Sequence, residues 1–292
     1  MSWSTEFADC VECDAPLGKL TWFRLGGPAR YLSRPRSADE LAAIMTRARN
    51  EGLETQVLGA GANVLVRDDG VDGVVVRLDQ PGFREVEWDG LTARVGAGVD
   101  LMLFVRECSA RGLSGLEGLA GIPGTIGGAV RMNAGTRHGE IGDVVRDVEL
   151  LRRDNVRDTW TRDQLGFGYR RSALDGEIVL SARLEFSQGD PQQVNEAFVE
   201  HLAEKMRTQP LGAHSAGCVF KNPAGRSAGE LIDRAGLKGT RCGGARVARE
   251  HANFIVADDG ASASDVLRLI DLIRDRVARE FDVELELEVE VW

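Results

Sequence analysis

Apolar and acidic residues alternate through the last ten positions of the chain, VELELEVEVW. A period of two is typical of a β-strand, because successive side chains point to opposite faces. The pattern therefore predicts a terminal strand, whose acidic face is by default the solvated one. Its apolar face holds Val283, Leu285, Leu287, Val289 and Val291, and its acidic face holds Glu284, Glu286, Glu288 and Glu290.

Apolar residues at helical spacing predict four amphipathic helices, over residues 37–49, 99–111, 190–207 and 262–280. Ser37 can cap the first, and Asp190 can cap the third with Pro191 at its first position. Short apolar strands separate these helices, so the chain contains both helices and sheet. The first 20 residues read as a loose lead-in, and Thr208–Gln209–Pro210 mark a domain boundary.

Composition narrows the class of protein. The chain has 292 residues, of which 43% are hydrophobic and 28% charged, so it can bury a core in two or three domains. The net charge of −10 argues against binding to nucleic acid or to a membrane surface, which would favour a basic footprint. No apolar run approaches the ~18 residues of a membrane span, and the N-terminus does not read as a signal peptide.

The cysteines and histidines predict no metal site. Five cysteines are an odd number without a disulfide framework, which fits a reducing cytoplasm. Cys10 and Cys13 form a C-x-x-C, but no second pair follows at zinc-site spacing. None of the four histidines makes an H-x-x-x-H or H-E-x-x-H motif.

Glycine is concentrated in GLEGLAGIPGTIGGAVRMNAG, residues 115–135. Such a stretch either wraps an anion, usually a phosphate, with its backbone N–H groups, or packs tightly against other backbone. An earlier small-residue loop after an apolar strand could grip the same diphosphate from the other side. The candidate residues are Gly121, Ile122, Pro123, Gly124, Thr125, Gly127 and Gly128 in the stretch and Gly59, Ala60, Gly61, Ala62 and Asn63 in the earlier loop.

Two later segments carry polar chemistry. GYRRSA contains Tyr169 and Arg170, and such an arginine either pairs with a carboxylate or is simply exposed at a strand end. SAGCVFKN contains Cys218, which is either a buried inert thiol or a proton donor near Lys221.

Taken together, the segments resemble the UDP-N-acetylenolpyruvoylglucosamine reductase (MurB) family. The resemblance runs from about Thr21 to the end of the chain. The short connection between GYRRS and SAGCVFKNP is similar to the family's shorter form, which lacks an extra substrate-covering loop. The matching segments are TWFRLGGPA, VLGAGANVLV, GLEGLAGIPGTIGGAVRMNAG, FGYRRS, SAGCVFKNP, AGELIDRAGLKG, GGARVAREHANFIV and LELEVEV.

The resemblance implies an α+β fold, with a two-lobed FAD-binding region of the vanillyl-alcohol-oxidase (PCMH) type and a smaller α/β substrate-binding domain. The implied division is a lead-in at 1–20, FAD-binding lobes at 21–80 and 81–207, a substrate domain at 208–280 and a C-terminal strand at 281–292. It also implies a cytoplasmic enzyme that acts on a UDP-sugar; we expect a monomer.

The resemblance further implies the reaction and its residues. NADPH would reduce FAD, and flavin N5 would pass a hydride to the methylene carbon of the enolpyruvyl ether. Arg170 and Glu288 match the catalytic arginine and glutamate that stabilise the intermediate. Cys218 falls where many members carry a proton-donating serine, and Tyr169, Lys221 and Asn222 are expected near the substrate.

Two rival functions remain open from sequence. One is a different FAD-linked oxidoreductase of the same fold, which would not need the Arg170, Cys218 and Glu288 trio. The other is a non-catalytic nucleotide-binding protein. The only feature that favours it is Cys218, which stands where many family members carry a serine.

Overall fold

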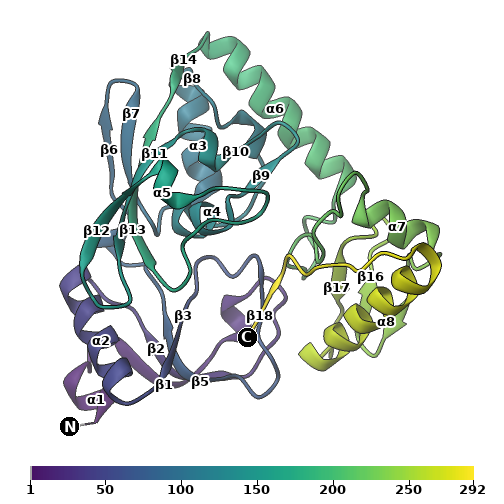
Figure 1. Ribbon diagram of the computed structural model, residues 1–292, viewed down its shortest axis with the longest axis horizontal. Helices are drawn as coiled ribbons and strands as arrows, with labels where there is room; N and C mark the ends of the chain where they lie inside the picture. Colours follow the sequence, from purple (N-terminus) through teal and green to yellow (C-terminus); the bar gives the residue numbers. More distant parts are fainter. Residues whose placement is uncertain (1) are drawn as a thin grey trace. The chain divides into compact units, whose positions relative to one another are not determined.

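Residues 2–292 are described by the computed structural model, in which contacts divide the chain into two compact units (Figure 1). The first unit contains the residues up to Cys13, then Tyr31–Ala60 and Asp72–Lys205. The second contains Asp14–Arg30, Gly61–Val71 and Met206–Trp292. Short segments from the N-terminal part of the chain thus belong to the second unit. The predicted boundary at residues 208–210 falls close to Met206, whereas the division at residue 80 stays a prediction.

A four-stranded sheet, most of which belongs to the first unit, has the strand order β1-β2-β5-β3. Strands β3 and β5 run parallel, so a crossover must connect neighbouring strands of this sheet. Helix α2 lies between β2 and β3 in sequence and packs on β3. The bounds are β1 (Val11–Pro16), β2 (Pro28–Ser33), α2 (Ala38–Asn50), β3 (Glu54–Val57) and β5 (Val71–Val76).

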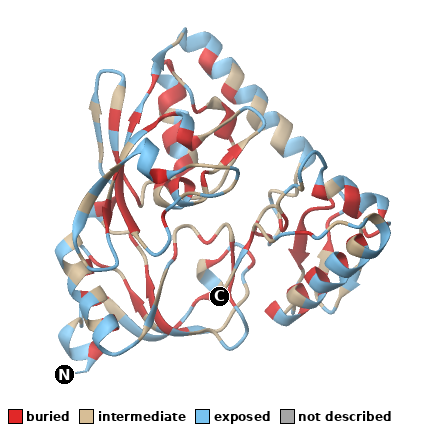
Figure 2. Ribbon diagram, in the orientation of Figure 1, coloured by how far each residue is buried: buried red, intermediate tan, exposed pale blue. Residues whose placement is uncertain are grey.

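The larger sheet is antiparallel and lies wholly in the first unit, with the order β12-β11-β13-β7-β6. Helix α4 packs on β13 and β7, and one apolar core joins residues of both sheets (Figure 2). The bounds are β6 (Val86–Asp89), β7 (Thr92–Gly96), α3 (Leu101–Ala110), α4 (Ile126–Met132), β11 (Val145–Leu151), β12 (Arg157–Thr161) and β13 (Ile178–Glu185).

Shorter elements complete the part of the chain before residue 209. Strand pairs β8–β14 and β9–β10 are antiparallel. The bounds are α1 (Trp3–Glu6), η1 (Gly18–Leu20), η2 (Pro81–Phe83), β8 (Leu113–Ser114), η3 (Glu117–Leu119), β9 (Gly135–Thr136), β10 (Gly139–Glu140), η4 (Ile141–Asp143), α5 (Arg162–Leu165), β14 (Ser187–Gln188) and α6 (Pro191–Thr208).

The second unit has a core of its own, which includes Phe23 and Leu65 from the N-terminal part of the chain. Helix α8 packs on β15 and β16 of a three-stranded antiparallel sheet. The last strand, β18, pairs in parallel with β4. The bounds are β4 (Val64–Leu65), α7 (Ala228–Arg234), β15 (Arg241–Cys242), β16 (Ala245–Val247), β17 (Ile255–Ala257), α8 (Ala263–Phe281) and β18 (Glu290–Val291).

The four predicted helices are confirmed as α2, α3, α6 and α8, with small shifts at their ends. The Ser37 side chain accepts from Glu40 N–H, and Asp190 Oδ1 accepts from the N–H groups at the start of α6, so both predicted caps are present. The first 20 residues are not loose, since Trp3 is 3% exposed and stacks on Tyr31 with ring centroids 4.6 Å apart.

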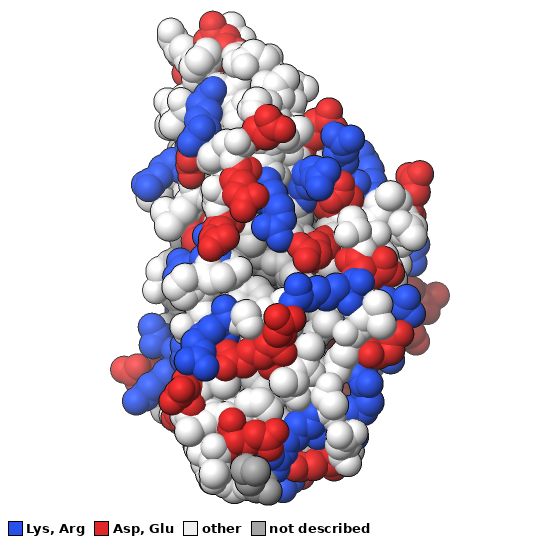
Figure 3. Space-filling model, turned by 90° about the vertical axis from the view of Figure 1, so that its left-hand side faces the viewer, with Lys and Arg blue, Asp and Glu red and all other residues white. Residues whose placement is uncertain are grey.

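The surface agrees with the acidic but mixed composition. On the face shown in Figure 3, acidic and basic side chains are interspersed. Among residues 2–292, no helix combines the length and the apolar character needed to cross a bilayer.

Candidate active site

Backbone hydrogen bonds join the glycine stretch to the connection between β7 and α3. Leu101 N–H donates to Gly124 C=O at 3.1 Å, and Gly127 N–H donates to Ala97 C=O at 2.8 Å. A Cβ on Gly127 would lie 2.9 Å from the Ala97 Cβ, so this glycine serves close packing. Gly124 has φ of +152° and faces open space. Close packing is therefore confirmed at Gly127, and anion binding stays a prediction for the open position at Gly124.

The two small-residue loops meet in the first unit. A Cβ added to Gly59 would lie 2.7 Å from Thr125 Oγ1, so only glycine permits this approach. Thr125 is the N-cap of α4, and its hydroxyl accepts from Gly128 N–H. Within the described chain, the backbone N–H groups of Gly59, Ala60, Gly124 and Thr125 find no acceptor. Four donors without an acceptor among the described residues thus belong to the two loops that touch here.

The rest of the earlier loop belongs to the second unit. Gly61 has φ of +69°, and a Cβ there would lie 2.2 Å from Leu20 C=O. Asn63 Nδ2 donates to the Glu288 C=O at 2.9 Å, and Glu290 N–H donates to the Asn63 C=O at 3.0 Å. The Asn63 side chain therefore holds the backbone of a predicted catalytic residue, a role that the sequence did not indicate.

Arg170 lies in the first unit in a left-handed backbone conformation, with φ of 53°. This conformation is uncommon for a side-chain-bearing residue and costs energy that the surroundings must offset. Its guanidinium donates to Gly135 C=O at 2.6 Å and lies 5.2 Å from the Tyr169 ring centroid. The end of the glycine stretch thus holds the arginine loop.

Asn133 is a residue that sequence reasoning missed. It is 0% exposed and ends α4 in the left-handed region. Its Nδ2 donates to Gly168 C=O at 3.0 Å, and its Oδ1 accepts from Gly142 N–H at 3.1 Å. A buried amide satisfied on both sides is a rigid support for the segment before Arg170. The only signal was a polar residue just after an apolar helix.

Residues 218–220 pair with the C-terminal segment in the second unit. Phe220 bridges Leu287 in antiparallel fashion, and Glu288 N–H donates to Val219 C=O at 2.8 Å. Val219 directly follows Cys218. The ladder therefore brings the backbones of Cys218 and Glu288 into neighbouring extended segments, although 70 positions separate them in sequence.

Asn253 holds the other side of the Cys218 segment and was also missed from sequence. Its side chain, 3% exposed, accepts from Phe220 N–H at 3.0 Å and donates to Phe220 C=O at 2.7 Å. Its own C=O accepts from Val219 N–H, and Cys218 bridges Phe254. The signal was an asparagine inside the apolar segment HANFIVA.

Glu288 differs from the other glutamates of the terminal strand. The predicted strand over the whole terminal segment is wrong in extent, because only Glu290–Val291 form β18, while Leu287 makes an isolated bridge. Leu285 and Val289 are buried, as the alternation predicts. Glu288 is half-buried, whereas the other three carboxylates of this terminal segment are exposed, namely Glu284, Glu286 and Glu290. Because its side chain is partly buried, Glu288 does not belong to a fully solvated acidic face as the other three glutamates do.

The two residues after this ladder have partners within the protein. Lys221 Nζ lies 2.5 Å from Glu286 Oε1. Asn222 Oδ1 accepts from Ala228 N–H at 3.0 Å, at the start of α7. These contacts place both side chains beside the Cys218 segment in the second unit, and their role toward a substrate stays a prediction.

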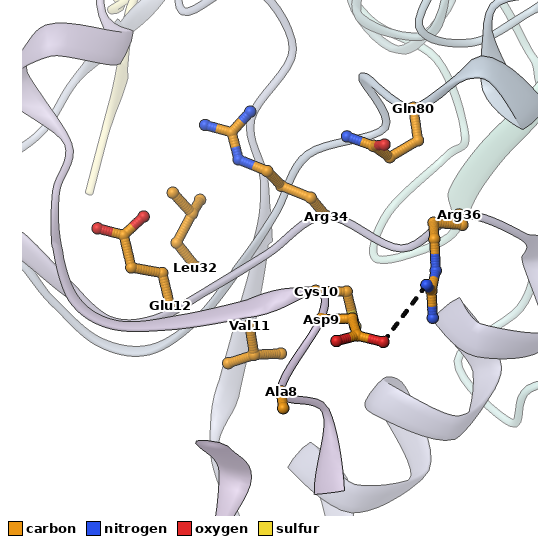
Figure 4. A pocket seen from close by; sticks show the side chains of 9 residues that line it. All are labelled: Ala8, Asp9, Cys10, Val11, Glu12, Leu32, Arg34, Arg36 and Gln80. Carbon is orange, nitrogen blue, oxygen red and sulfur yellow. Dashed lines mark ion pairs between the residues drawn. The ribbon is translucent and has the colours of Figure 1, made fainter. Parts of the chain in front are cut away.

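The C-x-x-C of the N-terminal segment lacks a reactive pair. Cys10 is buried and Cys13 is exposed, and burial, assisted by Glu40, raises the pKa of the Cys10 thiol to about 11. Cys10 lines a cavity of about 260 Å³ with charged neighbours, including the Asp9–Arg36 ion pair (Figure 4). A thiol with a raised pKa is a poor nucleophile and metal ligand.

The fold and the loops define an FAD-dependent oxidoreductase. An FAD-binding domain model matches residues 29–155, which include both small-residue loops. A model of the C-terminal domain of UDP-N-acetylenolpyruvoylglucosamine reductase matches residues 209–292. A glucose dehydrogenase structure, Phl p 4.0202, has a TM-score of 0.50 and 15% identity over 62% of this chain and 42% of its own, which supports the fold alone.

The chain belongs to the UDP-N-acetylenolpyruvoylglucosamine reductase family. It is 45% identical to the reductase of Moorella thermoacetica, with 97% of this chain and 93% of the relative covered. It is 36% identical to that of Bacillus subtilis, with coverage of 96% and 93%. The crystal structure of MurB from Thermus caldophilus matches with a TM-score of 0.83 and 43% identity, over 95% of this chain and 97% of its own.

The loop residues of the first unit fit the FAD diphosphate. Gly59 leaves no side chain at the point where the loops meet, and among residues 2–292 the N–H groups of Gly59, Ala60, Gly124 and Thr125 have no acceptor. Converging backbone N–H groups are suited to phosphate oxygens, because they supply partial positive charge without a bulky side chain. These residues would hold the diphosphate, and the acidic net charge would be overridden locally.

Proposed function

We propose that this enzyme reduces UDP-N-acetylglucosamine enolpyruvate to UDP-N-acetylmuramate with NADPH, in peptidoglycan precursor synthesis. The observation that carries the proposal is the ladder that joins the Cys218 segment to Glu288, which alone among four alternating glutamates is half-buried. The names of the relatives give the family's substrate. The trio of Arg170, Cys218 and Glu288 would supply the residues that this reduction needs.

FAD, held by the loops at Gly59–Ala60 and Gly124–Thr125, would supply hydride-transfer chemistry between NADPH and the methylene carbon of the enolpyruvyl ether. The adjacent carbon then gains negative charge that spreads into the substrate carboxylate. Arg170 would pair with that carboxylate, since a guanidinium forms strong charge-assisted hydrogen bonds to carboxylates. Glu288 would orient the reacting group from the terminal segment.

Cys218 would deliver the proton that completes the reduction. A thiol has an ordinary pKa of about 8.5, so it holds its proton at neutral pH and releases it to a carbanion more readily than an alcohol does. The proton would pass from Sγ to the carbon beside the ether oxygen, and solvent would reprotonate the thiolate. Lys221, Asn222 and Tyr169 would contact the UDP-sugar.

The test begins with a visible spectrum of the purified protein and a coupled assay of NADPH oxidation. We expect yellow protein, with oxidation that depends on the UDP-enolpyruvyl sugar. Oxygen-dependent turnover without that sugar would favour a different flavin oxidoreductase of the same fold. Colourless protein that cannot be loaded with FAD would contradict the proposal itself.

The roles are tested by matched variants in single-turnover reactions, which report chemistry apart from product release. Cys218→Ser should stay active and Cys218→Ala should lose at least about 100-fold, in line with the usual worth of general acid catalysis. Arg170→Ala should keep FAD and lose turnover. Full turnover in Cys218→Ala would remove Cys218 from the mechanism.

We also propose that the enzyme acts as a monomer in the cytoplasm. Its mixed charge and the odd number of cysteines are consistent with both. Light scattering of the eluted holoprotein should give one chain mass, and a doubled mass would contradict the monomer.

A further inference from the structure

A cluster of metal-ligating side chains lies in the first unit, beside the start of the glycine stretch. His138 belongs to the turn between β9 and β10, while His201 and Glu204 project from α6. One ligand atom from each of the three residues lies within 4.8 Å of the other two. We propose that His138, His201 and Glu204 bind a zinc ion, which no motif in the sequence indicates.

The distance between His138 and Glu204 suits tetrahedral coordination. His138 Nε2 lies 3.5 Å from Glu204 Oε2. Two ligands bonded to zinc at about 2.0–2.2 Å in a tetrahedron are separated by roughly 3.4 Å. His201 and Glu204 are three positions apart on one helix and therefore share a face. The two imidazole rings already lie with centroids 4.1 Å apart, so small rotamer changes complete the set.

A cation already occupies this position in the form of the Arg137 guanidinium. Its Nε donates to His138 Nε2 at 3.0 Å, and it also pairs with Glu204 Oε1 at 2.5 Å. His138 Nε2 therefore presents a lone pair toward the cluster, as a metal ligand must. The Arg137 side chain is 72% exposed, so it can turn into water when a metal replaces it.

The chemical types of the three ligands favour zinc over magnesium and calcium. Two imidazoles and one carboxylate match zinc sites with an open fourth position for water, whereas magnesium and calcium prefer oxygen ligands alone. Zinc would tie the β9–β10 turn to α6. Both parts support the glycine stretch, because a Cβ on Gly118 would lie 2.8 Å from His138 C=O and one on Gly121 would lie 3.1 Å from the Lys205 side chain.

Calorimetric titration of FAD-loaded, chelator-treated protein with zinc chloride tests the proposal. We expect one zinc per chain with a dissociation constant below about 10 μM, and no heat with magnesium chloride. His201→Asn and Glu204→Gln should each weaken binding at least tenfold, as loss of one of three ligands requires. Arg137→Gln should tighten it, because the competing cation is removed.

The matched control is His214→Asn, which removes an exposed histidine outside the cluster and should leave the affinity unchanged. Thermal melts with and without zinc give a second measure, since a ligand that binds only the folded state raises Tm. The His201→Asn variant should lose that rise. Equal zinc affinity in all variants, no binding by the wild type at 1 mM zinc, or weaker binding by Arg137→Gln would each overturn the proposal.

Discussion

Replacing Asn253 with alanine should destabilise the second unit and slow proton transfer together. The variant removes both partners of the Phe220 backbone, a donor to its C=O at 2.7 Å and an acceptor for its N–H at 3.0 Å. Phe220 is 1% exposed, so water does not reach these groups without an opening. Each buried polar group left unsatisfied costs about 1–3 kcal/mol, which gives roughly 2–6 kcal/mol for the pair.

Chemical denaturation and hydrogen exchange measure the first effect. The free energy of unfolding should fall by that amount, and the Phe220 amide should exchange faster. Single-turnover reduction of the substrate measures the second effect, because a displaced Cys218 would deliver its proton more slowly. Asn195→Ala is the control, since Asn195 is exposed on α6.

Two results would refute the reasoning. An unchanged unfolding free energy would mean that the two hydrogen bonds contribute nothing net. A less stable variant whose folded fraction reacts at the wild-type rate would mean that Asn253 supports the fold without positioning Cys218.

Three further predictions concern the other parts of the molecule. Asn133→Ala should lower kcat at least tenfold with FAD still bound, because it frees the segment before Arg170, the proposed catalytic arginine; unchanged kcat in steady-state assays would contradict this. Gly59→Ala should weaken FAD retention at least tenfold in flavin-release measurements, since its Cβ would lie 2.7 Å from Thr125 Oγ1, and wild-type retention would show that the loops can separate without loss. Hydrogen bonds from Ser264 and the start of α8 lower the pKa of Asp68, so the carboxylate contributes stability above its unfolded pKa of about 4 and loses it as pH falls through the folded value. Asp68→Asn should therefore be less stable than wild type at pH 7, with a difference in unfolding free energy that shrinks below pH 4; a constant difference would exclude the carboxylate charge as the cause.

Local pattern was enough to predict the helices and the burial of Leu285 and Val289, but not the length of the terminal strand, of which only Glu290–Val291 form. Ser37 and Asp190 cap their helices as expected, because capping depends on residues within one turn. The glycine stretch was also visible, since its composition is unusual. Sequence alone did not separate Gly127, which packs against Ala97, from Gly124, which faces open space.

Supporting residues could not be predicted because their partners are distant in sequence. Asn133 and Asn253 are ordinary asparagines until the chain places Gly168 and Phe220 beside them. The His138 and His201 rings meet only because a turn packs against α6.

The sequence by itself determined the family, the helices and the candidate residues Arg170, Cys218 and Glu288. Only the tertiary structure decided that Glu288 is half-buried while its alternating neighbours are exposed, and that its backbone pairs beside Cys218. The physical reason is that strand pairing depends on partners far along the chain. A period of two shows that a segment is extended, but it does not show which segment lies against it.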